Sequence, residues 1–303
     1  MDKCYLGIDI GGTAVKLGLV DECGHVLARD EQSVSFDNYK TPILTTVERA
    51  AAEFLAAQRV SPAGIGVSAT GQIDSNRGIV AGTGGNLPGW DGAPIKETLE
   101  RAFSLPVTVA NDANCMCLGE AWAGAAKGYT DVIGITIGTG IGGGILTGGR
   151  LLEGARGLGG EMGHYRTHAI DGVDCTCGAK GCWERYASTT ALVRAARAMD
   201  PELTDGRAIF AAARAGRCDV LALLDRWMDE IAQGLAGMVH IFNPQRILVG
   251  GGVSAQKELL IQPLERKVKA AVMPAFAEEL TVTAAALQND AGLVGAVYYL
   301  LHH

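Results

Sequence analysis

Two short glycine-rich turns constrain the fold of this 303-residue chain more than any other feature of its sequence. The first, residues 11–13, joins the strand-like runs 5–10 and 14–20. The second, residues 138–140, follows the apolar run 132–137 and precedes another glycine-rich, β-like segment. Each pattern predicts a β-hairpin closed by a tight glycine turn.

Strand and helix patterns follow each of these hairpins. Apolar runs predict further strands near residue 26 and over 65–69, 107–110, 144–146 and 246–249. Apolar residues at helical spacing predict helices over 41–59, 95–103, 113–122, 187–199, 220–242 and 292–301. A hairpin followed by βα units, repeated once in each half, predicts an α/β protein with two lobes around a cleft.

Charge and hydropathy exclude two classes of partner. The net charge is -7 and the sequence has no run of Lys and Arg, whereas a nucleic-acid surface needs a basic face. The N-terminal segment lacks the features of a signal peptide, and no apolar run approaches the ~20 residues of a membrane helix. We therefore expect a cytoplasmic protein that binds neither nucleic acid nor membrane.

The second turn contains the pattern G-x-G-x-x-G over residues 138–143, which is typical of dinucleotide-binding folds. That fold needs a helix directly after the loop, because the pyrophosphate rests on the helix N-terminus. The residues that follow are glycine-rich and β-like instead. A Walker A motif is also missing, since no Gly-Lys-Ser or Gly-Lys-Thr occurs. The β-like segment after residue 143 therefore disfavours a dinucleotide-binding fold, and the missing Walker A motif disfavours a P-loop fold.

A hairpin turn can also hold phosphate directly, because successive backbone N–H groups form a nest that glycine leaves open. Two such turns would hold a triphosphate from opposite lobes. Asp9 is placed to hold Mg²⁺ or its waters, and Thr13, Lys16 and Thr139 to bind phosphate oxygens. Either turn alone is also compatible with an ordinary hairpin that binds nothing.

Three cysteines are clustered in a turn-rich segment, at Cys175, Cys177 and Cys182. Zinc usually takes four ligands, and His164 and His168 are the upstream candidates for the fourth. Three buried, reduced thiols without a metal are the alternative. For the other five cysteines, at positions 4, 23, 115, 117 and 218, we expect structural roles.

Six motifs, in order along almost the whole chain, resemble those of the ROK family of sugar kinases and related repressors. They are DIGGTAVKLGLV (9–20), NDAN (111–114), IGTGIGGGIL (137–146), GLGGEMGH (157–164), CTCGAKGCWE (175–184) and VGGGVS (249–254). The glycine turns alone are weakly specific, whereas the His and Cys signature within 161–184 is highly specific. The resemblance implies the actin-like ATPase (ribonuclease H-like) fold, with two α/β lobes around a cleft.

The same resemblance implies the lobes and the cofactors. The smaller N-terminal lobe is expected to contain residues 1–112 plus 290–303. The larger lobe, residues 113–289, is expected to carry the nucleotide contacts and the zinc site. ATP and Mg²⁺ are the implied cofactors, and the expected contacts are Asp9, Gly11, Gly12, Thr13, Lys16, Gly138, Thr139, Gly140, Gly251 and Gly252. For the last two, a helix-start turn without a ligand is the alternative.

Phosphoryl transfer requires an acceptor hydroxyl in line with the γ-phosphate and a group that takes its proton. Asp112, at the end of a predicted strand, is the candidate general base, and Asn111 is placed to hydrogen-bond a neighbouring hydroxyl. The alternative is that Asn111 or Asp112 only caps the helix that begins at Ala113. The resemblance favours catalysis by Asp112 and does not exclude capping.

By resemblance, the sugar hydroxyls are expected to contact Asn86, Asn111, Asp112, Glu161, His164 and Glu184. Surface exposure is the alternative for Glu161 and Glu184. The resemblance also selects His164, rather than His168, as the fourth ligand of a structural Zn²⁺ with Cys175, Cys177 and Cys182. That ion would orient His164 and Glu184 without activating a substrate. Trp90 is expected to pack in the interior.

The resemblance therefore implies an ATP-dependent hexose kinase, with the 6-hydroxyl of glucose as the leading acceptor. N-acetylmannosamine, a β-glucoside and fructose are alternative acceptors within the family. A sugar-responsive repressor or sensor without catalysis is an alternative from another class. Such repressors carry a helix-turn-helix domain before the first strand, which here begins by residue 5. The family also suggests a homodimer or homotetramer.

Overall fold

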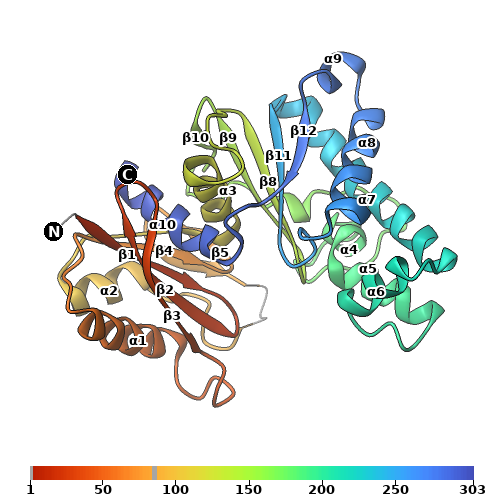
Figure 1. The fold of residues 1–303 in the computed structure, drawn as a ribbon. Coiled ribbons are helices and arrows are strands. Elements are labelled where there is room, and N and C mark those ends of the chain that lie inside the picture. Colours follow the sequence, from red (N-terminus) through yellow and green to blue (C-terminus); the bar gives the residue numbers. More distant parts are fainter. Residues whose placement is uncertain (1–2, 84–86) are drawn as a thin grey trace.

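The first half of the chain forms a five-stranded mixed sheet. The computed structural model describes residues 3–83 and 87–303 (Figure 1). The strand order is β3-β2-β1-β4-β7, with β1 antiparallel to β2 and parallel to β4. Its strands are β1 (Cys4–Ile10), β2 (Ala14–Asp21), β3 (Val26–Ser33), β4 (Ile65–Ala69) and β7 (Val107–Asn111).

Helices from distant parts of the chain cover the two faces of this sheet. Helices α1 (Ile43–Gln58) and α2 (Ile95–Phe103) lie on one face, and the C-terminal α10 (Ala291–His302) lies on the other (Figure 1). Gly66 on β4 permits this packing, because a Cβ there would collide with the backbone of Ala296 in α10. The final helix therefore belongs to the N-terminal sheet, although 170 or more residues separate them in sequence.

The second half forms another five-stranded sheet, of order β10-β9-β8-β11-β12. Strand β8 is antiparallel to β9 and parallel to β11. Ile133, Ile135 and Ile137 on β8 are buried against a large helical cluster, whereas Gly134 faces Cys117. The strands are β8 (Val132–Ile137), β9 (Ile141–Thr147), β10 (Arg150–Leu151), β11 (Arg246–Gly250) and β12 (Thr281–Ala284).

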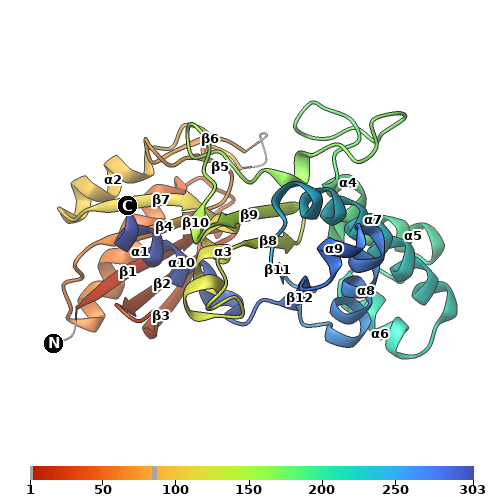
Figure 2. The same cartoon turned by 90° about the horizontal axis from the view of Figure 1, so that it is seen from above.

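Most of the remaining elements surround the second sheet, and the β5–β6 hairpin (residues 72–82) lies beside β7 of the first sheet (Figure 2). The helical cluster on the second sheet contains α4 (Glu184–Ala187), α5 (Thr189–Met199), α6 (Gly206–Arg214), α7 (Cys218–Phe242), α8 (Gln262–Ala271) and α9 (Pro274–Ala277). Short elements are the hairpin β5 (Gln72–Asp74) and β6 (Ile79–Gly82), the 3₁₀ turns η1 (Met162–His164) and η3 (Gln288–Asp290), and the π-helical turn η2 (Lys257–Ile261).

Helix α3 (Asp112–Ala123) joins the two halves. It packs on β8 and β9 of the second sheet and also crosses α10 of the first (Figure 1). Gly119 in α3 and Gly295 in α10 allow the close crossing, since a Cβ on either would collide with the backbone of the other helix. Asp112 therefore begins a helix that is buried between the second sheet and α10.

Most of the predicted elements are confirmed, with bounds that shift by a few residues. The predicted helix 187–199 begins at Thr189, because Ser188 accepts a hydrogen bond from the N–H of Ala191 and caps it. Sequence patterns did not predict β12, the β5–β6 hairpin, α6, α8 or α9, which are short or weakly periodic. Among the described residues, every helix is too short or too polar to cross a membrane.

Candidate active site and metal centre

A cavity of about 610 Å³ lies where elements of both halves meet. The first sheet contributes the residues after β4 and the β7–α3 junction, and the second contributes the β8–β9 turn. The predicted site residues that line it are Asn111, Asp112, Gly138, Thr139, Gly140, Glu161, His164, Cys177, Glu184 and Gly251. Asn86 lies outside the described residues.

Sequence reasoning missed one wall of this cavity. Thr70, Gly71 and Gln72 follow β4 directly, Gly82 ends β6, and Thr83 follows it. Strand β4 is parallel to β7, so the two strands end at the same edge of the sheet. The polar residues directly after the predicted strand 65–69 were the signal that identifies this wall.

Asn111 caps α3. Its Oδ1 accepts hydrogen bonds from the backbone N–H groups of Ala113 (2.9 Å) and Asn114 (3.3 Å), and its Nδ2 donates to the carbonyl oxygen of Gly71 (2.9 Å). Asn111 therefore caps the helix, and it also lines the cavity, where its proposed contact with a hydroxyl stays a prediction. These bonds also hold the β7–α3 junction against the segment that follows β4.

Asp112 is the carboxylate that this junction presents to the cavity. Its Oδ1 accepts a hydrogen bond from the N–H of Ala113 (2.8 Å). Burial and, after it, the negative charge of Asp9 raise the pKa of Asp112 to about 7, against the opposing effect of the hydrogen bond from Ala113. A carboxyl group with a pKa near neutrality is suited to accept a proton from a hydroxyl.

Glu161, His164 and Glu184 converge on the same cavity from separate segments. His164 Nε2 lies 3.9 Å from Glu161 Oε2, and His164 Nδ1 lies 3.8 Å from Glu184 Oε1. Burial raises the pKa of Glu161. Two acceptors flanking an imidazole form a polar wall that matches the hydroxyl groups of a sugar.

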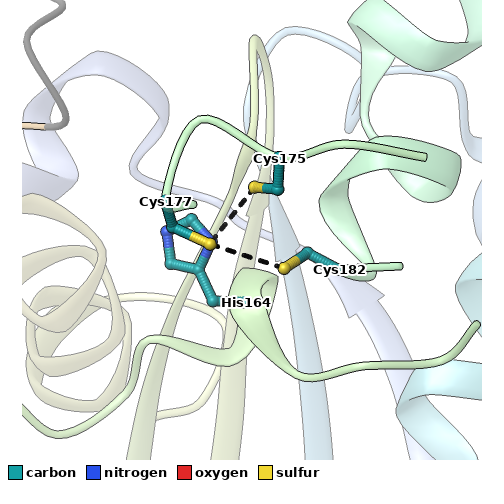
Figure 3. Close-up of side chains that lie close together, drawn as sticks. All are labelled: His164, Cys175, Cys177 and Cys182. Atoms are coloured by element: carbon teal, nitrogen blue, oxygen red, sulfur yellow. Dashed lines mark hydrogen bonds between the residues drawn. The ribbon is translucent and has the colours of Figure 1, made fainter. Parts of the chain in front are cut away.

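His164, Cys175, Cys177 and Cys182 bring their ligand atoms within 4.8 Å of one another (Figure 3). Cys177 Sγ lies 3.6 Å from Cys182 Sγ, and Cys175 Sγ lies 3.7 Å from His164 Nδ1. Two thiolates on one tetrahedral zinc, at about 2.3 Å each, are about 3.8 Å apart. The donor set and its spacing therefore fit Zn²⁺.

His168 is not part of this cluster. Its ring stacks on Tyr186 with 3.8 Å between the ring centroids, and its Nε2 lies 3.6 Å from Glu230 Oε1. Its side chain is half-buried. Of the two histidines left open by spacing, the structure places His164 beside the three thiols.

Asp9 belongs to the first glycine turn and is tied to two neighbours. The buried Ser68 donates a hydrogen bond to Asp9 Oδ1 (2.6 Å), and Lys16 Nζ lies 3.5 Å from Asp9 Oδ2. Among the described residues, neither of the two large cavities is lined by Asp9, Gly11, Gly12, Thr13 or Lys16. The first turn is thus not in the same cavity as the second.

A second cavity, of about 780 Å³, adjoins the first at Gly138 and Thr139. Gly252 and Val253 line it, and the turn from 250 to 253 precedes the helical segment η2, as predicted. Sequence reasoning missed its other walls, which come from α5, α6 and their connection. They include Thr189, Val193, Arg194, Arg197, Arg207 and Phe210.

Other sequence predictions concern packing. Trp90 is buried, and its Nε1 donates a hydrogen bond to the carbonyl oxygen of Thr70 (3.0 Å). Cys115 and Cys117 are buried, as expected. Cys23 and Cys218 are exposed, so burial does not account for the structural roles expected for them.

The chain is similar to known sugar kinases over nearly its whole length. It is 37% identical to the glucokinase of Thermotoga maritima over 96% of this chain and 95% of that protein. A ROK family glucokinase of Streptomyces griseus, solved with glucose and AMPPNP, is 34% identical with a TM-score of 0.82, over 97% of each chain.

A ROK family transcriptional regulator, a homologue of the E. coli MLC protein, has a TM-score of 0.85 and 25% identity. The alignment covers 98% of this chain and 78% of the regulator. The model of the ROK family matches residues 5–303. The chain therefore belongs to the ROK family and has the actin-like ATPase fold of its ROK structural relatives.

Proposed function

We propose that this protein transfers the γ-phosphoryl group of ATP to the 6-hydroxyl of glucose. The observation that carries the proposal is the pair of cavities that share Gly138 and Thr139. The smaller cavity contains the carboxylate of Asp112 and a wall of polar side chains. The larger cavity has apolar side chains and several arginines in its walls. The glucokinase relatives, one of them bound to glucose and AMPPNP, support this assignment.

The acceptor hydroxyl is bound beside Asp112. Its oxygen forms a bond to the γ-phosphorus while the bond to the bridging oxygen of ADP breaks, and the hydroxyl proton passes to Asp112. A pKa of about 7 leaves much of Asp112 ionised at neutral pH and basic enough to take that proton.

The nucleotide occupies the larger cavity, with its phosphates at the β8–β9 turn. Thr139 and Gly140 present backbone N–H groups there, whereas Gly138 lines both cavities and closes the turn by donating its N–H to the carbonyl oxygen of Gly140 (3.0 Å). Gly252 in the larger cavity and Gly251 at the smaller one contact the adenosine. Asp9 holds Mg²⁺ or its waters, and Gly11, Gly12, Thr13 and Lys16 contact the phosphates. Mg²⁺ supplies charge neutralisation between the phosphates when it is bound.

The hydroxyl groups of the sugar that do not react bind Glu161, His164, Glu184 and Asn86. Zn²⁺ held by His164 Nδ1, Cys175, Cys177 and Cys182 would supply rigidity and no reaction step. With Nδ1 directed to the metal, His164 Nε2 is left to face the sugar beside Glu161. Glu184 lies two residues after Cys182, so the same cluster sets its position.

The smaller lobe in this proposal contains residues 1–112 plus 290–303, and the larger lobe contains 113–289. The packing of α10 on the first sheet supports placing the C-terminal segment in the smaller lobe. The first glycine turn lines neither cavity, so it reaches the phosphates when the two lobes close on the substrates.

A sugar sensor without catalysis is a second candidate, and the similarity to a ROK family transcriptional regulator favours it. A kinase releases ADP when it is given ATP and its sugar, whereas a sensor binds the sugar without releasing ADP. ADP release with ATP and Mg²⁺ is to be measured with glucose, N-acetylmannosamine, a β-glucoside and fructose. Turnover highest with glucose supports the proposal, whereas sugar binding without turnover for every sugar refutes it and supports a sensor.

A further inference from the structure

A second group of metal-binding side chains lies in the turn between β2 and β3, away from both cavities. Asp21, Cys23 and His25 bring one ligand atom each within 4.8 Å of the others. Asp21 ends β2, and the glycine turn with Thr13 lies at the other end of that strand. This group, which we call the hairpin cluster, shares no residue with the Cys₃His cluster.

The backbone of the turn holds the carboxylate of Asp21 in place. Asp21 Oδ1 accepts hydrogen bonds from the N–H groups of Cys23 and His25, each at 2.8 Å. Asp21 Oδ2 lies 2.9 Å from His25 Nδ1. The N–H of Asp21 also donates to the carbonyl oxygen of His25 (3.1 Å), which closes the turn. The carboxylate and imidazole are thus already side by side.

The turn itself is anchored on helix α3. Gly24 has φ +85°, and a Cβ there would lie 3.2 Å from the ring of Trp122 and 3.1 Å from the Cβ of Ala123. The ligand side chains face outward: the His25 side chain is 75% exposed, and Cys23 is exposed. An ion can therefore reach the cluster from solvent without opening the fold.

We propose that the hairpin cluster is a surface site for a divalent transition-metal cation of the Zn²⁺, Co²⁺ and Ni²⁺ class. A thiolate and an imidazole favour these borderline cations over Mg²⁺ and Ca²⁺, which prefer oxygen ligands. The carboxylate and the thiolate together balance the charge of the ion. Three protein ligands leave a position for water or for a further ligand.

The site is tested by titrating the purified full-length protein with Co²⁺ and recording its absorption bands in the visible and near-ultraviolet. The parent is expected to show a thiolate-to-cobalt absorption band. The part of this band that comes from cobalt at the hairpin cluster should be lost in both Cys23→Ser and His25→Ala. The matched controls are Cys218→Ser and His302→Ala, which replace exposed residues elsewhere and should keep that part of the band.

Fluorescence gives an independent measurement, because Trp122 packs against the turn. Co²⁺ bound at the hairpin cluster should quench Trp122, and the quenching should be absent from Trp122→Phe and from Cys23→Ser. Identical cobalt spectra and quenching in the parent, Cys23→Ser and His25→Ala would overturn the proposal. Cobalt that enters the Cys₃His cluster gives a signal shared by all these variants, so it does not obscure the result.

Discussion

The β1–β2 turn and the β8–β9 turn have the same length and the same position in their sheets, but their surroundings differ. Each has three residues, and each begins with a glycine N–H that donates to a carbonyl of the turn region, at 2.9 Å for Gly11 and 3.0 Å for Gly138. The first is flanked by the paired charges of Asp9 and Lys16. At the position of that pair, the second has Thr136 opposite Gly142.

In the proposed function, this difference separates two contributions to phosphate binding. The second turn supplies N–H groups and a threonine hydroxyl at a wall that both cavities share. The first turn brings a carboxylate and an ammonium group, and it lies outside both cavities. A repeated hairpin can thus serve as a neutral nest in one lobe and as a charged clamp in the other.

The largest effect on turnover is expected from replacing Asp112, which lies between the two turns in the sequence. Replacing it with Asn removes the proton acceptor and should lower kcat by about 10³-fold. Glucose binding, measured by calorimetry, should change little because the amide keeps the shape of the side chain. Asp225→Asn, an exposed residue paired with Lys267, is the control and should retain the parent rate. Full turnover by Asp112→Asn would contradict the assigned role.

The charge of the first turn is tested by Asp9→Asn. Loss of the carboxylate that holds Mg²⁺ or its waters should lower kcat by roughly 10²-fold and raise the Mg²⁺ concentration needed for half-maximal rate. Asp30→Asn, on β3 of the same sheet, is the control. An unchanged Mg²⁺ dependence would contradict the proposal that the carboxylate beside the first turn holds Mg²⁺ or its waters.

The Cys₃His cluster contributes Cys177 and His164 to the cavity that the second turn lines, and within residues 3–83 and 87–303 no such cluster accompanies the first turn. Cys177→Ser should reduce bound zinc to well under one ion per chain and raise the glucose KM by about 10-fold or more. It should also lower Tm by a few °C. Cys218→Ser should change none of these. A parent protein without zinc, by elemental analysis, would refute the metal assignment.

Substitutions at two glycines of the second turn would separate its proposed contacts with sugar and nucleotide. A Cβ at Gly140 would collide with Glu184 Oε2, whereas one at Gly138 meets no atom within 4 Å. Gly140→Ala should therefore displace Glu184 and raise the glucose KM about tenfold, or about 1.4 kcal/mol. Gly138→Ala should affect the ATP KM instead. Equal glucose KM values in the two variants would contradict this division.

The smallest effect is expected in the pH profile. Protonated Asp112 cannot accept the hydroxyl proton, so kcat should rise as pH passes through about 7. The negative charge of Asp9 raises the pKa of Asp112, so Asp9→Asn should lower it and move the midpoint of its residual activity to lower pH. A midpoint that moves upward would show that the first turn does not act on the base in this way.

Local sequence patterns were sufficient to predict both glycine hairpins, the β7–α3 junction with Asp112, and the cysteine turn. Each depends on residues close in the chain, such as the alternation of Ile133, Ile135 and Ile137 or the cap formed by Asn111. The absence of a helix after Gly143 was also predicted from glycine-rich sequence, and β9 confirms it. Short-range sterics and hydrogen bonding dominate in these segments.

Tertiary structure alone decided the features that depend on residues far apart in the chain. It put Glu184 against Gly140 and raised the pKa of Asp112 through burial and the charge of Asp9. Spacing left both His164 and His168 open and the family resemblance selected His164, which the fold then brings to the three thiols. Tertiary structure also formed the nucleotide-sized cavity from α5 and α6, which carry no motif. Burial and Coulomb interactions follow distance in space, which local sequence patterns do not contain.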